Sequence, residues 1–207
     1  MRQTITFKEI LQEEEIKTYI RRADLSLERM GFTEHSFAHV MRVSKCAGDM
    51  LQQLGYDEHD VELARIAGYM HDIGNVINRI DHAQSGAIMA FRILDKMGMQ
   101  YEDIAKIIAA IGNHDESTAF PVSDVAAALI IADKSDVRRS RVRNADKSSF
   151  DIHDRVNYAV TENHVSLSDD HTSLILSLTL DTEISPVIEY FEIFLSRMKL
   201  CQKAASY

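Results

Sequence analysis

The sequence predicts a mainly α-helical domain with a small β-hairpin near its C-terminus. Long helices are favoured because only two prolines and eight glycines interrupt the 207 residues, and because apolar residues recur at helical spacing as far as residue 133. The hairpin is indicated by apolar residues that alternate with polar ones from 173 to 180, after a polar turn at 168–171. A final amphipathic helix is expected over 185–204.

Helix-capping signals predict where the other helices begin and end. Thr33 and Asp57 are candidate N-caps, and Pro121 suits the first position of a helix. We expect helices over 7–30 (as one or two segments), 34–54, 58–72, 82–97, 101–112, 121–133 and 151–160. This order predicts an N-terminal helical segment (1–30), a core (31–145) and a helix-hairpin-helix extension packed on the core (146–207).

The composition limits the class of protein. Hydrophobic residues make up 45% and charged residues 27%, as in soluble globular proteins. A net charge of −9 argues against binding to extended nucleic acid. The longest apolar run, Val125 to Ala132, is too short to cross a membrane, and the N-terminus lacks the apolar stretch of a signal peptide. These features predict a cytoplasmic protein without a membrane partner.

Six histidines and aspartates stand out by their positions: five lie at or near predicted helix ends, and His39 lies inside a predicted helix. In a bundle with short loops, neighbouring helix ends converge. Imidazole and carboxylate ligands together suit Fe, Mn or Zn, so this pattern favours one or two divalent transition metal ions. Spacing alone leaves a second interpretation open, since a single histidine near a helix end is more often a cap or a surface residue. The six residues are His39, His71, Asp72, His82, His114 and Asp133.

Three short motifs carry a resemblance to a known family. They are His39-Val40-Met41-Arg42-Val43, Met70-His71-Asp72-Ile73-Gly74 and Ile131-Ala132-Asp133-Lys134-Ser135-Asp136. With the ordered histidines, they resemble the HD-domain superfamily of metal-dependent phosphohydrolases over roughly residues 30–145. The resemblance implies an all-helical HD-domain bundle in which His39, His71, Asp72 and Asp133 hold one metal ion. It also implies that His82 and His114 help to hold a second ion, with Asp72 as the bridge.

The resemblance implies a hydrolase that cleaves a phosphate ester or anhydride with metal-activated water. The expected substrate is a nucleotide or another small phosphorylated metabolite. Asp72 and Lys134 are the expected catalytic residues, and Lys134, Arg138, Arg141 and Asn75 the expected substrate contacts. A helix that continues past Asp133 would place three basic residues along one face: Lys134, Arg138 and Arg141. The arginines could equally form a solvated face paired with nearby acidic residues.

Asn75 is a departure from the family pattern, because many members have a lysine at this position. A catalytically silent metal-containing module that senses nucleotides is therefore an alternative to an enzyme. A structural metal site is less favoured, because the candidate ligands include no thiolate. The absence of a Gly-Tyr-Pro signature argues against the cyclic-di-GMP phosphodiesterase branch.

Several features outside the six-residue set remain open. His35, one turn before His39, is expected at the surface, with a role near the metal or substrate as the alternative. Asp115 and Glu116 could orient His114, hold a water or lie in a solvated loop. The C-terminal extension could form a lid or a homodimer contact. Surface positions are expected for His59, His153, His164 and His171.

Overall fold

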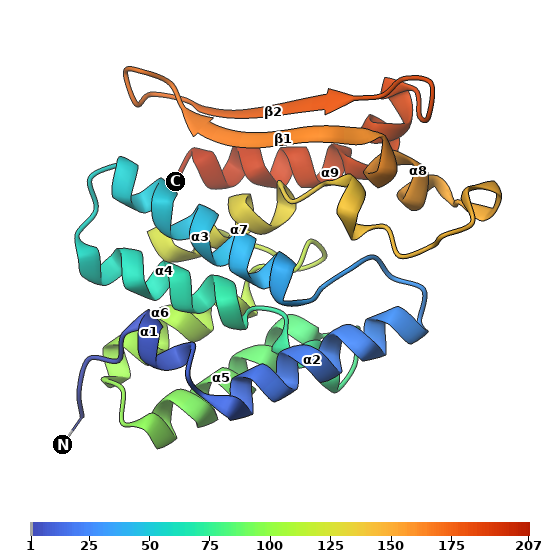
Figure 1. Ribbon diagram of the computed structural model, residues 1–207. Coiled ribbons are helices and arrows are strands. Elements are labelled where there is room, and N and C mark those ends of the chain that lie inside the picture. Colours follow the sequence, from blue (N-terminus) through green and yellow to red (C-terminus); the bar gives the residue numbers. More distant parts are fainter. Residues whose placement is uncertain (1) are drawn as a thin grey trace.

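The computed structural model describes residues 2–207 and confirms the mainly α-helical fold with a C-terminal hairpin and final helix (Figure 1). The helices of the first two thirds are α1 (Phe7–Ile10), α2 (Glu14–Arg29), α3 (Phe37–Gln53), α4 (Glu58–Met70), η1 (Ile73–Val76), α5 (His82–Met97), α6 (Tyr101–Gly112) and α7 (Asp124–Lys134). The remaining elements are η2 (Arg139–Arg141), η3 (Lys147–Ser149), α8 (Ile152–Ala159), β1 (Val160–Leu167), β2 (Leu174–Leu180) and α9 (Val187–Ala205).

Side-chain caps explain where the predicted helix starts were right and where they were wrong. Asp57 caps α4 as predicted, by accepting the N–H of Asp60 at 2.9 Å. The cap of α3 is Ser36 rather than Thr33. Pro121 does not open α7. The Ser123 hydroxyl accepts the N–H of Ala126 at 3.1 Å and caps the helix, which begins at Asp124, three residues after Pro121.

The core is a bundle in which α7 occupies the centre. Every residue from Val125 to Ala132 is buried, and α7 packs against α3, α4, α6 and α9. The four alanines in this stretch allow those helices to approach closely. The N-terminal segment contributes Ile5, Ile10 and Ile16 to the same apolar core. This packing brings the end of α7 next to the ends of α4 and α6.

The C-terminal extension forms a layered cover on one side of the bundle (Figure 1). The antiparallel hairpin, in which Val165 pairs with Leu176, lies outermost, and α9 lies beneath it against α7. A second apolar cluster joins the extension to the chain after α7; its members are Val137, Val156, Val160, Tyr190 and Phe194. The division of the chain at residues 30 and 145 and the homodimer stay predictions. None of the helices within residues 2–207 is long and apolar enough to span a membrane.

The chain after Asp133 does not continue as the predicted helix. α7 ends at Lys134, the Ser135 hydroxyl donates to the Ala132 carbonyl at 3.0 Å, and Arg138 is extended, with φ −162°. Lys134, Arg138 and Arg141 therefore do not form one helical stripe, and their positions depend on the irregular path of residues 135–141.

Candidate metal centre

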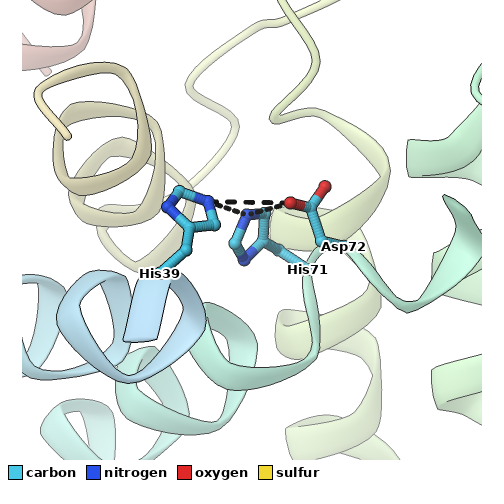
Figure 2. A group of neighbouring side chains, drawn as sticks. All are labelled: His39, His71 and Asp72. Atoms are coloured by element: carbon cyan, nitrogen blue, oxygen red, sulfur yellow. Dashed lines mark hydrogen bonds and ion pairs between the residues drawn. The ribbon is translucent and has the colours of Figure 1, made fainter. Parts of the chain in front are cut away.

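The six histidines and aspartates singled out in the sequence converge at one end of the bundle. His39 comes from the first half of α3, His71 and Asp72 follow α4, and His82 begins α5. His114 follows α6, and Asp133 lies in the last turn of α7. The four histidines are at most 2% exposed. Figure 2 shows His39 and His71 with ring nitrogens directed at the Asp72 carboxylate.

The ring nitrogens of His39 and His71 lie close to carboxylate oxygens of Asp72 and Asp133. His39 Nε2 lies 3.3 Å from His71 Nε2, 3.6 Å from Asp72 Oδ2 and 3.4 Å from Asp133 Oδ1. His71 Nε2 lies 3.3 Å from Asp72 Oδ2 and 3.7 Å from Asp133 Oδ1. Ligands placed about 2.1 Å from a tetrahedral ion lie about 3.4 Å apart. His39, His71 and Asp72 therefore form one compact group with ligand atoms within 4.8 Å of one another, and Asp133 lies beside both histidines and forms a second such group with His71 and His114.

The other carboxylate oxygen of Asp72 belongs to a second group. Its Oδ1 lies 3.5 Å from His82 Nε2 and 4.0 Å from His114 Nε2, and the two nitrogens are 3.2 Å apart. The half-buried Asp115 lies beside this group, with Oδ1 3.9 Å from His82 Nε2. One oxygen of Asp72 thus faces each group, an arrangement that fits the predicted bridging role.

Hydrogen bonds fix which ring nitrogen each histidine presents. His39 Nδ1 donates to the Asp136 carboxylate at 2.7 Å, and His71 Nδ1 donates to the Gly68 carbonyl at 2.8 Å. His82 Nδ1 donates to the Arg79 carbonyl at 3.0 Å, and His114 Nδ1 donates to the Ile111 carbonyl at 2.6 Å. A neutral imidazole that donates from Nδ1 keeps a lone pair on Nε2. The Nε2 atoms therefore face one another in two close pairs, His39 with His71 and His82 with His114, and two lone pairs at such distances repel unless a proton or a cation lies between them. The donor set, neutral imidazole and carboxylate, fits divalent transition metals.

Electrostatics favour the ligating state at His82, His114 and the two carboxylates. Burial alone would lower the pKa of His71, but the charges of Asp72 and Asp133 outweigh it and raise this pKa. Burial lowers the pKa of His82 and lowers that of His114 to about 3, so both are neutral at pH 7. Burial alone would raise the pKa of Asp72, but His71 outweighs it and holds this pKa well below its usual range. Lys134 acts in the same direction on the pKa of Asp133. Both carboxylates are therefore charged.

Gly74 allows the two halves of the centre to meet. A Cβ at this position would lie 2.0 Å from the carbonyl oxygen of His82 and 2.5 Å from the backbone nitrogen of Gly86. No side chain can be accommodated at those distances, so η1 can pack against the start of α5 only with glycine here. This close approach places the His71-Asp72 pair next to His82.

A cavity of about 310 Å³ opens onto the centre, and two of the predicted substrate contacts line it. Lys134 is 7% exposed, and its Nζ lies 2.6 Å from Asp133 Oδ2. Arg141 is 5% exposed and donates from Nε to the Glu34 carbonyl at 2.9 Å and from Nη1 to the Asp136 carbonyl at 2.8 Å. Among residues 2–207, Arg141 Nη2 has no hydrogen-bond partner, so a fixed donor remains for a ligand.

The other two predicted substrate contacts lie behind the cavity wall. Arg138 pairs with Glu34 at 2.7 Å and with Asp136 at 3.0 Å. Asn75 is 1% exposed and donates to Asp72 Oδ1 at 2.8 Å, so it holds the carboxylate in place. Neither residue lines the cavity. Their contact with substrate stays a prediction; in this structure Arg138 and Asn75 hold other residues in place.

Sequence reasoning undervalued several residues that line this cavity. His35 is not simply a surface histidine, because its ring packs 5.4 Å from that of His39 and faces the cavity. Its spacing of four residues from His39 was the available signal. His153 is exposed, as predicted, but lies at the cavity wall. Arg79, which gave no sequence signal, supplies a cation beside His82.

Several known proteins are similar to this chain. An uncharacterized protein of Methanocaldococcus jannaschii is 24% identical over 170 residues, covering 71% of this chain and 65% of that protein. Ribonuclease Y of Bacillus thuringiensis is 30% identical over 122 residues, which are 59% of this chain and 22% of the enzyme. A solved structure described as a predicted HD superfamily hydrolase, from an uncultured Thermotogales bacterium, is 26% identical with a TM-score of 0.49. The matched region covers 65% of this chain and 75% of the chain in that solved structure.

The chain thus spans about two thirds of the archaeal relative and about a fifth of ribonuclease Y. The family model for the HD domain matches residues 36–151, more than half of the chain. This segment contains all six converging residues together with Lys134 and Arg141. The protein belongs to the HD domain family.

Proposed function

We propose that this protein is a metal-dependent phosphohydrolase that hydrolyses a phosphate ester or anhydride of a nucleotide or another small metabolite. One observation carries the proposal: four histidines and two aspartates converge at one end of a cavity with a basic wall, and four of the six, Asp72, His82, His114 and Asp133, line that cavity. The cations on that wall are Arg79, Lys134, Arg141 and Arg197. Such a cavity suits an anionic substrate held against metal.

The residues that would hold metal divide into two groups. His39, His71, Asp72 and Asp133 would hold one ion, and Asp72, His82 and His114 would contribute to a second. When bound, Fe, Mn or Zn supplies Lewis acidity toward a phosphoryl oxygen and lowers the pKa of water. The neutral imidazoles of His82 and His114 and the charged carboxylates are already in the state that ligation requires, whereas His71, whose pKa is raised, would lose its proton when metal binds.

The protein side chains have distinct roles around the phosphate. Lys134 places an ammonium beside Asp133, where it would neutralise charge on a phosphoryl oxygen. Arg141 is held by two backbone carbonyls, so its free Nη2 is preorganised to donate to phosphate. Both cations are buried, and charge-assisted hydrogen bonds are stronger where water is excluded. Asn75 keeps Asp72 oriented between the two groups.

The cavity favours a small substrate over extended nucleic acid. Its volume of about 310 Å³ lies at the lower end of the range for small-molecule sites. Residues of α8 and α9 also line it and limit its size. The net charge of −9 would repel a polyanion away from the local basic wall.

The experiment that tests this function measures metal and turnover together. Purified protein is analysed for bound metal and assayed with nucleotides, dinucleotides, phosphomonoesters and a short RNA, in Mn²⁺ or Fe²⁺. We expect turnover of a small phosphorylated compound that falls at least about a thousandfold in Asp72→Ala. The control is Asp103→Ala, which removes another buried aspartate paired with a histidine, His59, at 2.8 Å.

Two results would contradict the proposal. Tight nucleotide binding without hydrolysis under every metal condition would identify a nucleotide-sensing module instead. Protein that neither contains metal nor gains thermal stability from it would exclude both the enzyme and the metal-containing sensor.

A further inference from the structure

Helix α9 has two apolar faces, and only one of them is buried. Its inner face carries Tyr190 and Phe194, which are buried, and the helix contacts α7 and α8. Its outer face carries four large apolar side chains that are 46–69% exposed and lie three or four residues apart in sequence: Val187, Ile188, Phe191 and Leu195. We call these four residues the α9 stripe. A helix that is apolar on both faces is normally covered on both, so the stripe is a contact surface in need of a partner.

One edge of the α9 stripe carries an acid and a base. Glu192 and Lys199 are both exposed and are seven residues apart, close to two helical turns, so they lie along the same edge. Leu195 lies between them, three residues after the acid and four before the base. Neither charge belongs to an ion pair among residues 2–207, in contrast to Glu189 and Arg197 of the same helix.

This charge pattern is complementary to itself. When two identical helices pack antiparallel about a two-fold axis level with Leu195, residues on one edge of the first helix meet residues on the same edge of the second. Glu192 then lies opposite Lys199 of the partner subunit, and the reciprocal pair forms on the other side of the axis. In a parallel pair, the same edges would lie on opposite sides of the interface, and the acid would not meet the base.

We infer that the chain forms a two-fold homodimer in which the α9 stripes of two copies pack antiparallel. The apolar side chains would be covered at the centre, and two ion pairs would flank them. The inner face of α9 lines the metal cavity through Phe194 and Arg197, so the dimer and the cavity use different faces of the helix. The inference does not depend on the proposed function.

The charges argue against a lipid surface as the partner of the α9 stripe. Helices that lie on membranes carry several lysines or arginines beside their apolar face. The edge of this stripe has one lysine and one glutamate, and the chain has a net charge of −9, which an anionic membrane would repel. A second copy of the chain satisfies both the apolar side chains and the two unpaired charges.

Sedimentation velocity of the full chain, over protein concentrations from about 1 to about 200 μM, tests the dimer. We expect a dissociation constant in the micromolar range, because the stripe is smaller than the roughly 800 Å² per partner of a standard interface. Leu195→Glu would place two like charges at the two-fold axis and should raise the dissociation constant at least about a hundredfold. Folding of this variant is checked by circular dichroism.

Charge reversal tests the antiparallel arrangement without altering the apolar side chains. Glu192→Lys and Lys199→Glu each place like charges opposite one another, so each should weaken self-association about tenfold at low salt. An equimolar mixture of the two variants restores opposite charges at both contacts and should form heterodimers as tightly as the unsubstituted protein. The control is Lys8→Glu, which makes the same charge change at an exposed position on α1, on the opposite side of the bundle (Figure 1).

Four results would overturn the inference. The first is a monomer at every concentration, and the second is an unchanged dissociation constant in Leu195→Glu. The third is a mixture of the charge variants that associates no more tightly than either variant alone. The fourth is equal weakening in Lys8→Glu and Lys199→Glu, which would make net charge the cause. A monomer that binds phosphatidylcholine and phosphatidylglycerol vesicles, and loses this binding in Leu195→Glu, would assign the α9 stripe to a lipid surface instead.

Discussion

Replacing Asp136 with asparagine would test whether residues behind the ligands control metal binding. Asp136 is 2% exposed and accepts the Nδ1–H of His39 at 2.7 Å. It also pairs with Arg42 at 3.1 Å and with Arg138 at 3.0 Å. The asparagine side chain would have nearly the same shape but no charge. It could also turn its NH₂ toward His39 and favour the tautomer that protonates the ligating Nε2.

The size of the effect follows from the bond that is weakened. A hydrogen bond to a charged group contributes about 1.5–3 kcal/mol and a neutral one about 0.5–1.5 kcal/mol. The difference of roughly 1–1.5 kcal/mol corresponds to about a tenfold loss of metal affinity. The arginines around Asp136 would also lose their partner, so the metal-free protein should be less stable. Affinity must therefore be measured where both proteins are fully folded.

The assay is a calorimetric titration of metal-free protein with Mn²⁺ or Zn²⁺. Only the group that contains His39 should weaken, while binding at the His82 and His114 group stays within about twofold. Asp146→Asn is the control, because it removes the same charge from an exposed helix cap. Unchanged affinity in Asp136→Asn, or equal weakening of both sites, would refute the assignment of Asp136 as a positioning residue.

Three further predictions concern stability and substrate binding. The pKa of His114 is about 3, below its ordinary value of 6.5, so between these pH values the unfolded chain binds more protons and the free energy of unfolding rises with pH. In urea unfolding of metal-free protein, His114→Asn should therefore lose less stability than the unsubstituted protein as the pH falls below 6.5. Equal dependence of the unfolding free energy on pH in the two proteins would contradict this. Gly74→Ala should lower the free energy of unfolding by about 3 kcal/mol or more because of its backbone clash, whereas Gly112→Ala, whose Cβ would lie 3.6 Å from its nearest neighbour, should be tolerated. Arg141→Lys should lower kcat/KM about tenfold or more, since an ammonium cannot bind two carbonyls and a phosphate as the guanidinium does; unchanged kinetics would place the phosphate elsewhere.

The sequence by itself determined the helical fold and the group of residues that converges. The helices over 82–97 and 101–112 have the predicted bounds, and Asp57 is the predicted cap. These features are local, because apolar periodicity and capping depend on residues a few positions apart. The six histidines and aspartates were also identified from their positions at helix ends and their motif context.

Tertiary structure decided what each polar residue around the centre does. Arg141 lines the cavity and Arg138 does not, because the chain leaves α7 at Lys134 and follows an irregular path. The Asn75 amide lies behind Asp72, and Asn157 faces the centre from a helix far along the chain. These placements depend on packing between distant segments, which decides whether a polar atom meets protein or cavity. Local spacing indicated that choice for His35, one turn from His39, but not for Arg138, Arg141, Asn75 or Asn157.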